Sequence, residues 1–210
     1  MMLNKKCRCN TISLMIMEGD IGMNKKLKIM IDMDDVICTD GFLYLLNKYL
    51  NTNYTYDDFN DFYMQDIIPN KIEFFDWFKN QNVYDYCRLN DDCYDVLKEL
   101  NENYDLYIGT SYIWREIVGE SGFVLGQKFE YLQRELPFIS PYQYIFISDK
   151  SVLDMDIKID DRIDNLSNCS VKLLFSAYHN RKYTDEYLVS LGIERMNNWL
   201  EVRDRLLNNK

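Results

Sequence analysis

The sequence predicts an α/β protein built on a parallel β-sheet that helices cover on both faces. Short apolar runs typical of buried strands alternate along the chain with helical patterns. Several of these runs end in polar or charged residues, as strands that lead to a ligand-binding edge do. A block of helical patterns, residues 41–101, follows the first strand and indicates an inserted unit.

The most informative stretch is residues 27–36. Its apolar run ends in Asp32, Asp34 and Asp35, three carboxylates within four positions. Carboxylates so close repel one another and are costly to bury without a partner, which favours a bound cation. Mg²⁺ is the natural candidate because it prefers oxygen ligands. The stretch alone fits a strand followed by a solvated acidic turn or a helix N-cap equally well.

The inserted block shows no strand pattern. Residues 41–50 carry an apolar stripe of helical spacing, and Thr55-Tyr-Asp-Asp58 has the form of a capping box that opens a second helix through Met64. Two more helices are expected over residues 70–80 and 91–101. The block has the size of a small lid.

The remainder of the chain returns to alternating strands and helices. Strands are expected at 104–110, 144–148, 157–159 and 171–175, and the strand at 171–175 is expected to be the last of the chain. Helices are expected at 127–136 and 197–207. Three of these strands end in Thr110-Ser111, Asp149-Lys150 and Asp160-Asp161. Because the carboxyl ends of parallel strands meet at one edge of a sheet, we expect these groups to converge with Asp32.

Such a convergence suits phosphoryl transfer. Asp32 would attack a phosphorus atom and form an aspartyl-phosphate, which divides one difficult hydrolysis into two easier displacements. Asp34 points to the same side of the extended chain. It would protonate the departing alkoxide and then take a proton from the attacking water.

The other groups would supply charge. Mg²⁺ would be held by an Asp32 oxygen, the backbone carbonyl of Asp34 and the carboxylates of Asp160 and Asp161. The groups expected to bind the remaining phosphoryl oxygens are Thr110, Ser111 and Lys150. Taken singly, each of these also fits a plainer interpretation: a helix cap, a surface lysine or an acidic turn. Their order and shared place at strand ends favour the functional interpretation.

The order of these groups resembles the four motifs of the haloacid dehalogenase (HAD) superfamily. The motifs are Asp32-Met33-Asp34-Asp35-Val36, Thr110, Lys150 and Asp160-Asp161. Other stretches resemble the 5'(3')-deoxyribonucleotidases: Ser148-Asp149-Lys150, Ile159-Asp160-Asp161-Arg162, Lys128-Phe-Glu-Tyr-Leu, Leu173-Leu-Phe175 and Trp199-Leu-Glu-Val. The resemblance covers residues 27–207. It implies an HAD-like Rossmannoid three-layer fold, with a core of residues 27–40 and 102–210 and a helical cap of residues 41–101.

The resemblance also implies an activity, a Mg²⁺-dependent phosphomonoesterase that acts on deoxyribonucleoside 5'-monophosphates, with 3'-monophosphates as an open second class of substrate. Aromatic cap residues hold the base in that family. Here Phe74, Phe75, Trp77 and Phe78 offer such rings. The spacing of the three phenylalanines is equally that of an ordinary core stripe. Two other functions stay open: an HAD phosphatase for another small metabolite, and a non-catalytic protein that binds phosphate or metal.

Two residues near the motifs have no clear role from sequence. Asp35 stands where many relatives have Gly, and it adds a third acid beside the expected metal. His179 is the only histidine of the chain and follows the last expected strand. Because Asp34 already fills the role of acid and base, we expect His179 to be a loop residue that borders the site.

Composition limits the partners. The formal net charge of −10 and the absence of a basic stripe argue against nucleic-acid polymers. The six cysteines lack paired metal-ligand spacing and indicate reduced thiols in the cytoplasm. Residues 1–26 are expected to be a disordered tail, or part of an over-extended reading frame whose natural start is Met23. Their short apolar run predicts no membrane span. A homodimer is compatible with the sequence.

Overall fold

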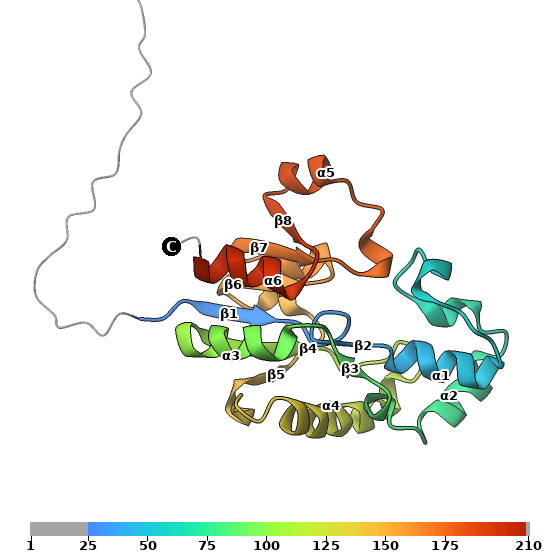
Figure 1. Ribbon diagram of the computed structural model, residues 1–210. Coiled ribbons are helices and arrows are strands. Elements are labelled where there is room, and N and C mark those ends of the chain that lie inside the picture. The colour runs from blue at the N-terminus through green and yellow to red at the C-terminus, as the bar shows by residue number, and fades with distance from the viewer. Residues whose placement is uncertain (1–24, 209–210) are drawn as a thin grey trace, which may run out of the picture.

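The computed structural model describes residues 25–208 and contains one large sheet of six strands, in the order β5-β4-β1-β6-β7-β8 (Figure 1). All neighbouring strands in it are parallel. The strands are β1 Lys28–Ile31, β4 Asp105–Thr110, β5 Tyr144–Phe146, β6 Met155–Asp160, β7 Cys169–Phe175 and β8 Ile193–Met196. The predicted α/β class with a parallel sheet is confirmed. The predictions of a disordered tail over residues 1–26 and of a start at Met23 fall on residues 1–24, which lie outside the described residues, except at residues 25 and 26. Of these two, Lys26 donates from Nζ to the Glu102 carbonyl oxygen at 2.6 Å.

Strand β1 lies at the centre of the sheet, and its Ile29, Met30 and Ile31 are fully buried. Ile31 stands opposite Ile108 of β4 on one side and opposite Ile159 of β6 on the other. The residues that follow these three positions therefore leave the sheet at the same edge. This register brings together the segments that carry the predicted site.

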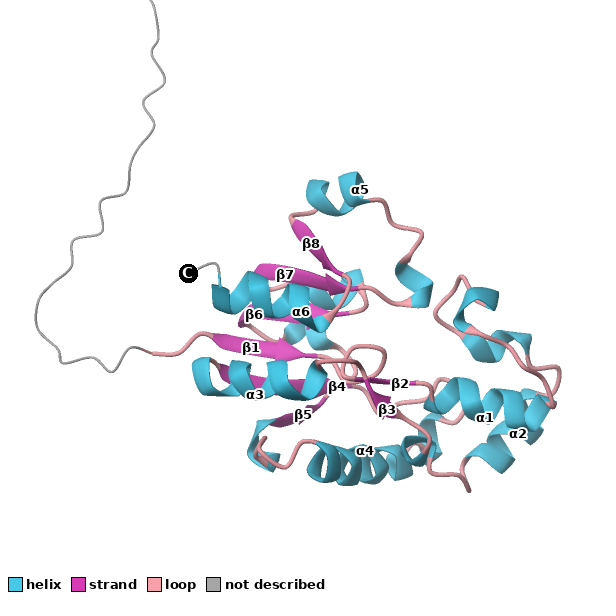
Figure 2. Ribbon diagram, viewed as in Figure 1, coloured by secondary structure: helices cyan, strands magenta, loops and turns pink. Residues whose placement is uncertain are grey.

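The helices flank this sheet and extend beyond its carboxyl edge (Figure 2). They are α1 Gly41–Leu50, α2 Lys71–Phe78, α3 Cys93–Asn103, α4 Gly122–Glu135, α5 Asp185–Ser190 and α6 Trp199–Arg203. Helices α3 and α6 pack against each other. The buried Trp199 at the start of α6 donates from Nε1 to the Val36 carbonyl oxygen at 3.0 Å, which fixes the loop that follows β1. In the described part of the chain, no helix combines the length and hydropathy that crossing a membrane requires.

The two strands of a short antiparallel ribbon flank the helical insertion in the sequence. Strand β2 Cys38–Thr39 pairs with β3 Arg88–Leu89, so the chain enters and leaves the insertion side by side. The prediction of no strand between residues 41 and 101 was wrong here, since a two-residue strand carries no alternating pattern. Helix α3 lies after β3 and contacts β4 and α6. We therefore propose that the cap ends at the ribbon and that α3 belongs to the core.

The second helix predicted for the insertion, from the Thr55 capping box through Met64, does not form. The capping box is present, because the Thr55 N–H donates to Asp58 Oδ2 at 2.7 Å. It opens only a 3₁₀ turn, Tyr56–Asp58, and a second turn follows at Met64–Ile67. The aspartates and asparagine between residues 57 and 61 are poor helix formers. Tertiary contacts hold the segment instead: Tyr56 stacks on Tyr178 with ring centroids 5.3 Å apart.

The C-terminal part of the chain contains two elements that the sequence did not predict, α5 and β8. Strand β8 pairs only with β7 at the edge of the sheet. Its exposed Glu194 separates the apolar residues, which hides the strand from a search for apolar runs. The strand predicted as the last, β7, is therefore followed by one more. The predicted closing helix is confirmed as α6, which continues into a π-helical turn at Asp204–Asn208.

Candidate active site

The loop after β1 is a tight turn that presents acids in two directions. The Met33 carbonyl oxygen accepts from the N–H groups of Ile37 at 2.8 Å and Cys38 at 3.0 Å. Within this turn Asp35 has a φ of 59°, in the left-handed region. Asp enters that region at lower cost than most residues because its short side chain can bond locally, and Gly enters it freely. The geometry shows why a turn at this position can be made by Asp as well as by Gly.

Lys150 joins two of the predicted acids. Its Nζ lies 2.6 Å from Asp32 Oδ2 and 2.8 Å from Asp160 Oδ2, and its side chain is 3% exposed. Burial would lower the pKa of Lys150, but the two carboxylates outweigh burial and the net shift is upward. The lysine thus stays charged. Buried Lys158 donates from Nζ to the Lys150 carbonyl oxygen at 2.8 Å and so fixes the turn.

The acid pair at the end of β6 completes the cluster. Carboxylate oxygens of Asp32, Asp160 and Asp161 all lie within 4.8 Å of one another. Asp160 Oδ1 accepts from the Arg162 N–H at 3.0 Å and from Asn165 Nδ2 at 2.9 Å, so its oxygens are largely occupied. Oxygen donors at this spacing suit a hard divalent cation. The acids of this cluster could therefore hold a metal ion.

His179 is buried next to this cluster. Its Nε2 lies 2.6 Å from Asp161 Oδ2, and the neighbouring Asn180 donates from Nδ2 to the Asp161 carbonyl oxygen at 2.9 Å. The two residues follow β7 in a 3₁₀ turn, from which their side chains contact the carboxylate and the backbone carbonyl of Asp161. Asp35 also approaches this group, with ligand atoms of Asp35, Asp161 and His179 within 4.8 Å of one another. The third acid of the loop thus faces the same charged cluster.

Burial raises the pKa of each acid in this group. For Asp32 burial is the largest cause, neighbouring carboxylates add to it, Lys150 opposes it, and the pKa rises to about 6. The pKa values of Asp35, Asp160 and Asp161 are raised by burial first and by neighbouring carboxylates second. In metal-free protein, the carboxylate forms are therefore destabilised relative to the unfolded chain.

We expect metal-free protein to lose stability as the pH rises from about 5 to 7. The folded state holds protons on these acids at a pH where the unfolded chain has released them, so raising the pH through about 6 favours unfolding. Surface acids with lowered pKa values, such as Asp66 and Glu194, act below this window. Thermal melting with a chelator at both pH values measures the effect. A higher melting temperature at pH 7 would contradict it.

Asp34 faces the cavity from the other side of the loop, and two donors hold its carboxylate. Tyr84 donates from its hydroxyl to Oδ1 at 2.8 Å, and the Lys128 ammonium donates to Oδ2. Lys128 is buried in α4 and also donates to the Thr110 hydroxyl oxygen. Thr110 is fully buried and turned toward Lys128, whereas Ser111 lines the cavity. Neither Lys128 nor Tyr84 was predicted as a site residue from the sequence.

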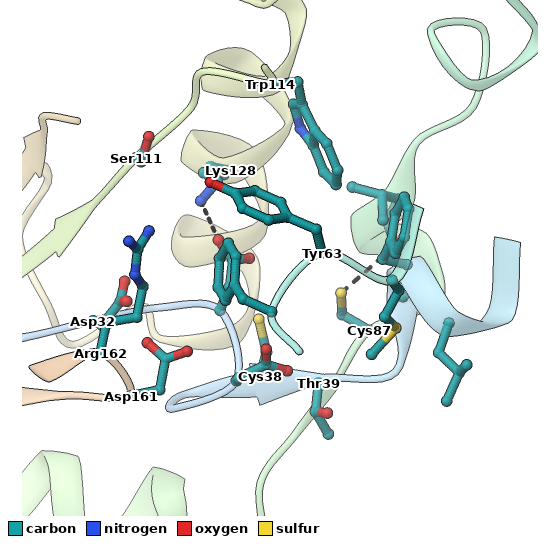
Figure 3. A pocket seen from close by; sticks show the side chains of 18 of the residues that line it. Asp32, Cys38, Thr39, Tyr63, Cys87, Ser111, Trp114, Lys128, Asp161 and Arg162 are labelled. Atoms are coloured by element: carbon teal, nitrogen blue, oxygen red, sulfur yellow. Dashed lines mark hydrogen bonds and ion pairs between the residues drawn. The ribbon is translucent and has the colours of Figure 1, made fainter. Parts of the chain in front are cut away.

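Of the predicted groups, Asp32, Asp34, Ser111, Lys150 and Asp161 border one cavity of about 260 Å³, whereas the fully buried Thr110 and Asp160 do not line it. Figure 3 shows Asp32, Asp161 and Lys128 around it together with Tyr63 and Trp114. Asp32 and Asp161, with Lys150, lie on one side of it, here called the charged end, and Trp114, with Phe42 beside it, lies on the other, here called the apolar end. Its aromatic or apolar lining comprises Phe42, Leu43, Tyr56, Phe62, Tyr63, Met64, Val83, Tyr84, Tyr112, Ile113, Trp114 and Tyr178. The cavity therefore offers a charged end and an apolar end.

The four rings of α2 proposed for base contact lie elsewhere. Phe74, Phe75 and Phe78 are at most 1% exposed and pack in the core, and Trp77 is partly buried against Tyr49. None of the four lines the cavity. The expectation that these rings hold the base is therefore corrected. The three phenylalanines form the core stripe that was the alternative, and other rings face the cavity.

A parallel sheet with a buried lysine and a cluster of acids at its carboxyl edge, opening into one cavity, is the arrangement that the resemblance to phosphatases of the haloacid dehalogenase type predicts. Residues 25–210 match the family described as 5' nucleotidase, deoxy (pyrimidine), cytosolic type C. The chain belongs to that family.

Two sequence relatives agree with this assignment. The chain is 29% identical over 174 residues to a 5'(3')-deoxyribonucleotidase of Bacillus subtilis, a match that covers 82% of this chain and 80% of that protein. A 5'(3')-deoxyribonucleotidase of Bacillus phage SPbeta matches at the same identity and coverage. Among solved structures, a haloacid dehalogenase-like hydrolase from Streptococcus pneumoniae is similar with a TM-score of 0.45 and 15% identity, over 86% of this chain and 98% of that one.

Proposed function

We propose that this protein is a Mg²⁺-dependent phosphatase that hydrolyses deoxyribonucleoside monophosphates through an aspartyl-phosphate on Asp32. The observation that carries the proposal is the contact of the Lys150 ammonium with Asp32 and Asp160 at the charged end of the cavity. The lysine would offset part of the charge of a phosphate dianion at that end. The family membership supports the same chemistry.

Asp32 is the proposed nucleophile. It lies at the end of β1, its backbone N–H donates to the Ile159 carbonyl oxygen at 2.9 Å, and its carboxylate reaches the cavity. As its oxygen bonds to phosphorus, the ester bond to the sugar oxygen breaks and that oxygen takes a proton from Asp34. In the second step a water molecule attacks phosphorus, gives its proton to Asp34 and releases Asp32 with phosphate.

Lysines would hold the phosphoryl oxygens during both steps. Lys150 supplies one charge, and Lys128, whose ammonium reaches Asp34, would supply a second one. Ser111 lines the cavity and can donate its hydroxyl to a third oxygen. We propose the Thr110 hydroxyl as a support for Lys128 as well as a phosphate ligand, because the two groups are in contact.

The proposed metal ligands are Asp32, the Asp34 backbone carbonyl, and the acid pair Asp160–Asp161. Of the pair, Asp161 has the oxygen atoms with fewer donors around them, whereas Asp160 is engaged by three. When bound, Mg²⁺ would neutralise charge on the acids and on the phosphoryl group that moves between them.

The apolar end of the cavity supports a nucleoside as the leaving group. Phe42 and Trp114 line it with ring centroids 5.0 Å apart, and Tyr63 stands nearby with the Arg115 guanidinium 3.9 Å above its ring. Flat apolar faces of this kind stack on any base. A sugar phosphate would leave them without a partner.

A panel of phosphate esters tests the proposal. With Mg²⁺ present, we expect kcat/KM for deoxyribonucleoside 5'-monophosphates to exceed that for hexose or glycerol phosphates at least about tenfold, the effect of about 1.4 kcal/mol of base contact. Released phosphate is the readout, and ribonucleotides and 3'-monophosphates complete the panel. Equal rates for sugar phosphates and nucleotides would favour a phosphatase for another metabolite.

Two further parts of the proposal concern the cellular location and the oligomeric state of the protein. We propose a cytoplasmic location, which the free thiols of Cys38 and Cys87 beside the cavity support. Assembly as a homodimer stays a prediction, and light scattering of the purified protein measures it.

A further inference from the structure

The carboxylate of Asp34 is held by a tyrosine from the inserted segment. Tyr84 lies in the 3₁₀ turn Val83–Asp85, just before β3, and its hydroxyl donates to Asp34 Oδ1 at 2.8 Å. The side chain of Asp34 is 53% exposed, so apart from Tyr84 and Lys128 little in the protein restrains it on the cavity side. Tyr84 itself is 3% exposed. A rigid, buried donor therefore meets an open carboxylate.

The surroundings keep Tyr84 in the donor role. Burial raises the pKa of its hydroxyl well above the ordinary value, and the charge of Asp34 raises it further. The ring of Tyr84 lies 5.5 Å from that of Tyr131 and 5.8 Å from the Lys128 ammonium, both on α4. The turn that carries Tyr84 thus packs on a core helix, which fixes where the hydroxyl points.

Lys128 holds the other oxygen of the same carboxylate, and this second bond would change on substrate binding. A phosphoryl group at the charged end competes with Asp34 for the Lys128 ammonium. Once Lys128 turns to the phosphoryl oxygens, Oδ2 is free to meet the leaving oxygen, and only Tyr84 restrains the carboxyl group. Positioning at that moment depends on the tyrosine hydroxyl.

We propose that Tyr84 is a positioning residue that aims Asp34 at the leaving-group oxygen, so that the enzyme can expel alkoxides that need a proton. The inference rests on the proposed function. In the first step Asp34 carries a proton on Oδ2, the oxygen that Lys128 has left; the Asp32 oxygen–phosphorus bond forms, the phosphorus–sugar oxygen bond breaks, and that proton moves to the sugar oxygen. An ester whose leaving group is stable as an anion needs no such proton, and its first step does not depend on Tyr84.

Tyr84→Phe tests the proposal with two esters, a deoxyribonucleoside 5'-monophosphate and p-nitrophenyl phosphate. The readout is the first-turnover rate, measured by rapid quench with enzyme in excess, because both esters share the later hydrolysis of the aspartyl-phosphate. We expect the rate for the nucleotide to fall about tenfold, the loss of about 1.4 kcal/mol of hydrogen bonding to a charged group. The rate for the nitrophenyl ester should stay within about twofold. KM for the nucleotide should also stay within about twofold, since Tyr84 acts on the acid and not on binding.

Tyr131→Phe is the matched control. Tyr131 is a buried neighbour of Tyr84 that does not line the cavity, and its hydroxyl makes no hydrogen bond to Asp34 or Lys128. Removing that hydroxyl should leave both first-turnover rates unchanged. If Tyr84→Phe slows both esters equally, its role is structural and the proposal is overturned. If it slows neither, the proposal is overturned as well.

The two proposals fail in different ways. Wild-type protein that cleaves the nitrophenyl ester but not the nucleotide contradicts the deoxynucleotide substrate alone, and the Tyr84 comparison then uses an alkyl phosphate that the panel shows to be accepted. Wild-type protein that cleaves no phosphate ester contradicts both.

Discussion

Asp32→Asn should lower kcat for a deoxyribonucleoside monophosphate by at least about 10³-fold, because an amide cannot form the aspartyl-phosphate. The variant should still fold. Asn has nearly the same shape, Lys150 keeps its contact with Asp160 at 2.8 Å, and one charge leaves a crowded group of acids. The measurement is phosphate release under saturating substrate, with thermal melting as the check on folding.

Asp91→Asn is the matched control for Asp32→Asn. It removes the same charge from a side chain that is 97% exposed, and it should leave kcat unchanged. If Asp32→Asn keeps activity near that of the wild type, Asp32 is not the nucleophile. A loss of folding in Asp32→Asn would show instead that the carboxylate holds Lys150 in place.

Removal of divalent ions should lower phosphatase activity about as much as Asp32→Asn does. It should also lower the stability of the folded protein. Asp32, Asp160 and Asp161 hold their oxygens within 4.8 Å of one another, so without a cation their repulsion opposes the folded state. Mg²⁺ at about 100 times its Kd would stabilise the protein by about 2.7 kcal/mol. For a chain of this length that corresponds to a rise in melting temperature of roughly 5–10 °C.

Melting curves with a chelator and with added Mg²⁺ measure this shift, and phosphate release is followed in parallel. Asp161→Asn should remove most of the shift, whereas Asp91→Asn should keep it. A melting temperature that does not respond to Mg²⁺ in the wild-type protein would contradict the metal site. Full activity in the presence of the chelator would do so too.

The sheet and the position of the motifs could be predicted because strands of this kind carry strong local signals. The apolar run before Asp32 and the acids at Asp160–Asp161 mark strand ends that the fold then brings to one edge. Strand β8 could not be predicted, because a strand that pairs on one side only needs few apolar residues. The turns of residues 56–67 depend on contacts with distant parts of the chain, which local propensity does not contain.

In the candidate site, too, residues with a local sequence signal could be predicted, and residues that depend on distant contacts could not. Lys128 was open to prediction, since it falls in the buried stripe of α4 with Val124, Tyr131 and Leu132, where a charged residue implies a buried partner. Tyr84 offered no such signal, because its bond to Asp34 spans 50 residues and depends on how the insertion folds back. The rings of α2 followed the simpler rule of an amphipathic helix and turned to the core.

A crystal structure with Mg²⁺ and beryllium fluoride, which mimics a phosphoryl group bound to a carboxylate, tests the central claim most directly. The account predicts beryllium bonded to an Asp32 oxygen, with Lys150 against a fluorine atom. It also predicts Mg²⁺ at about 2.1 Å from Asp32, the Asp34 carbonyl oxygen and an oxygen of the Asp160–Asp161 pair. An adduct on another residue, or an ion bound away from Asp32, would contradict it.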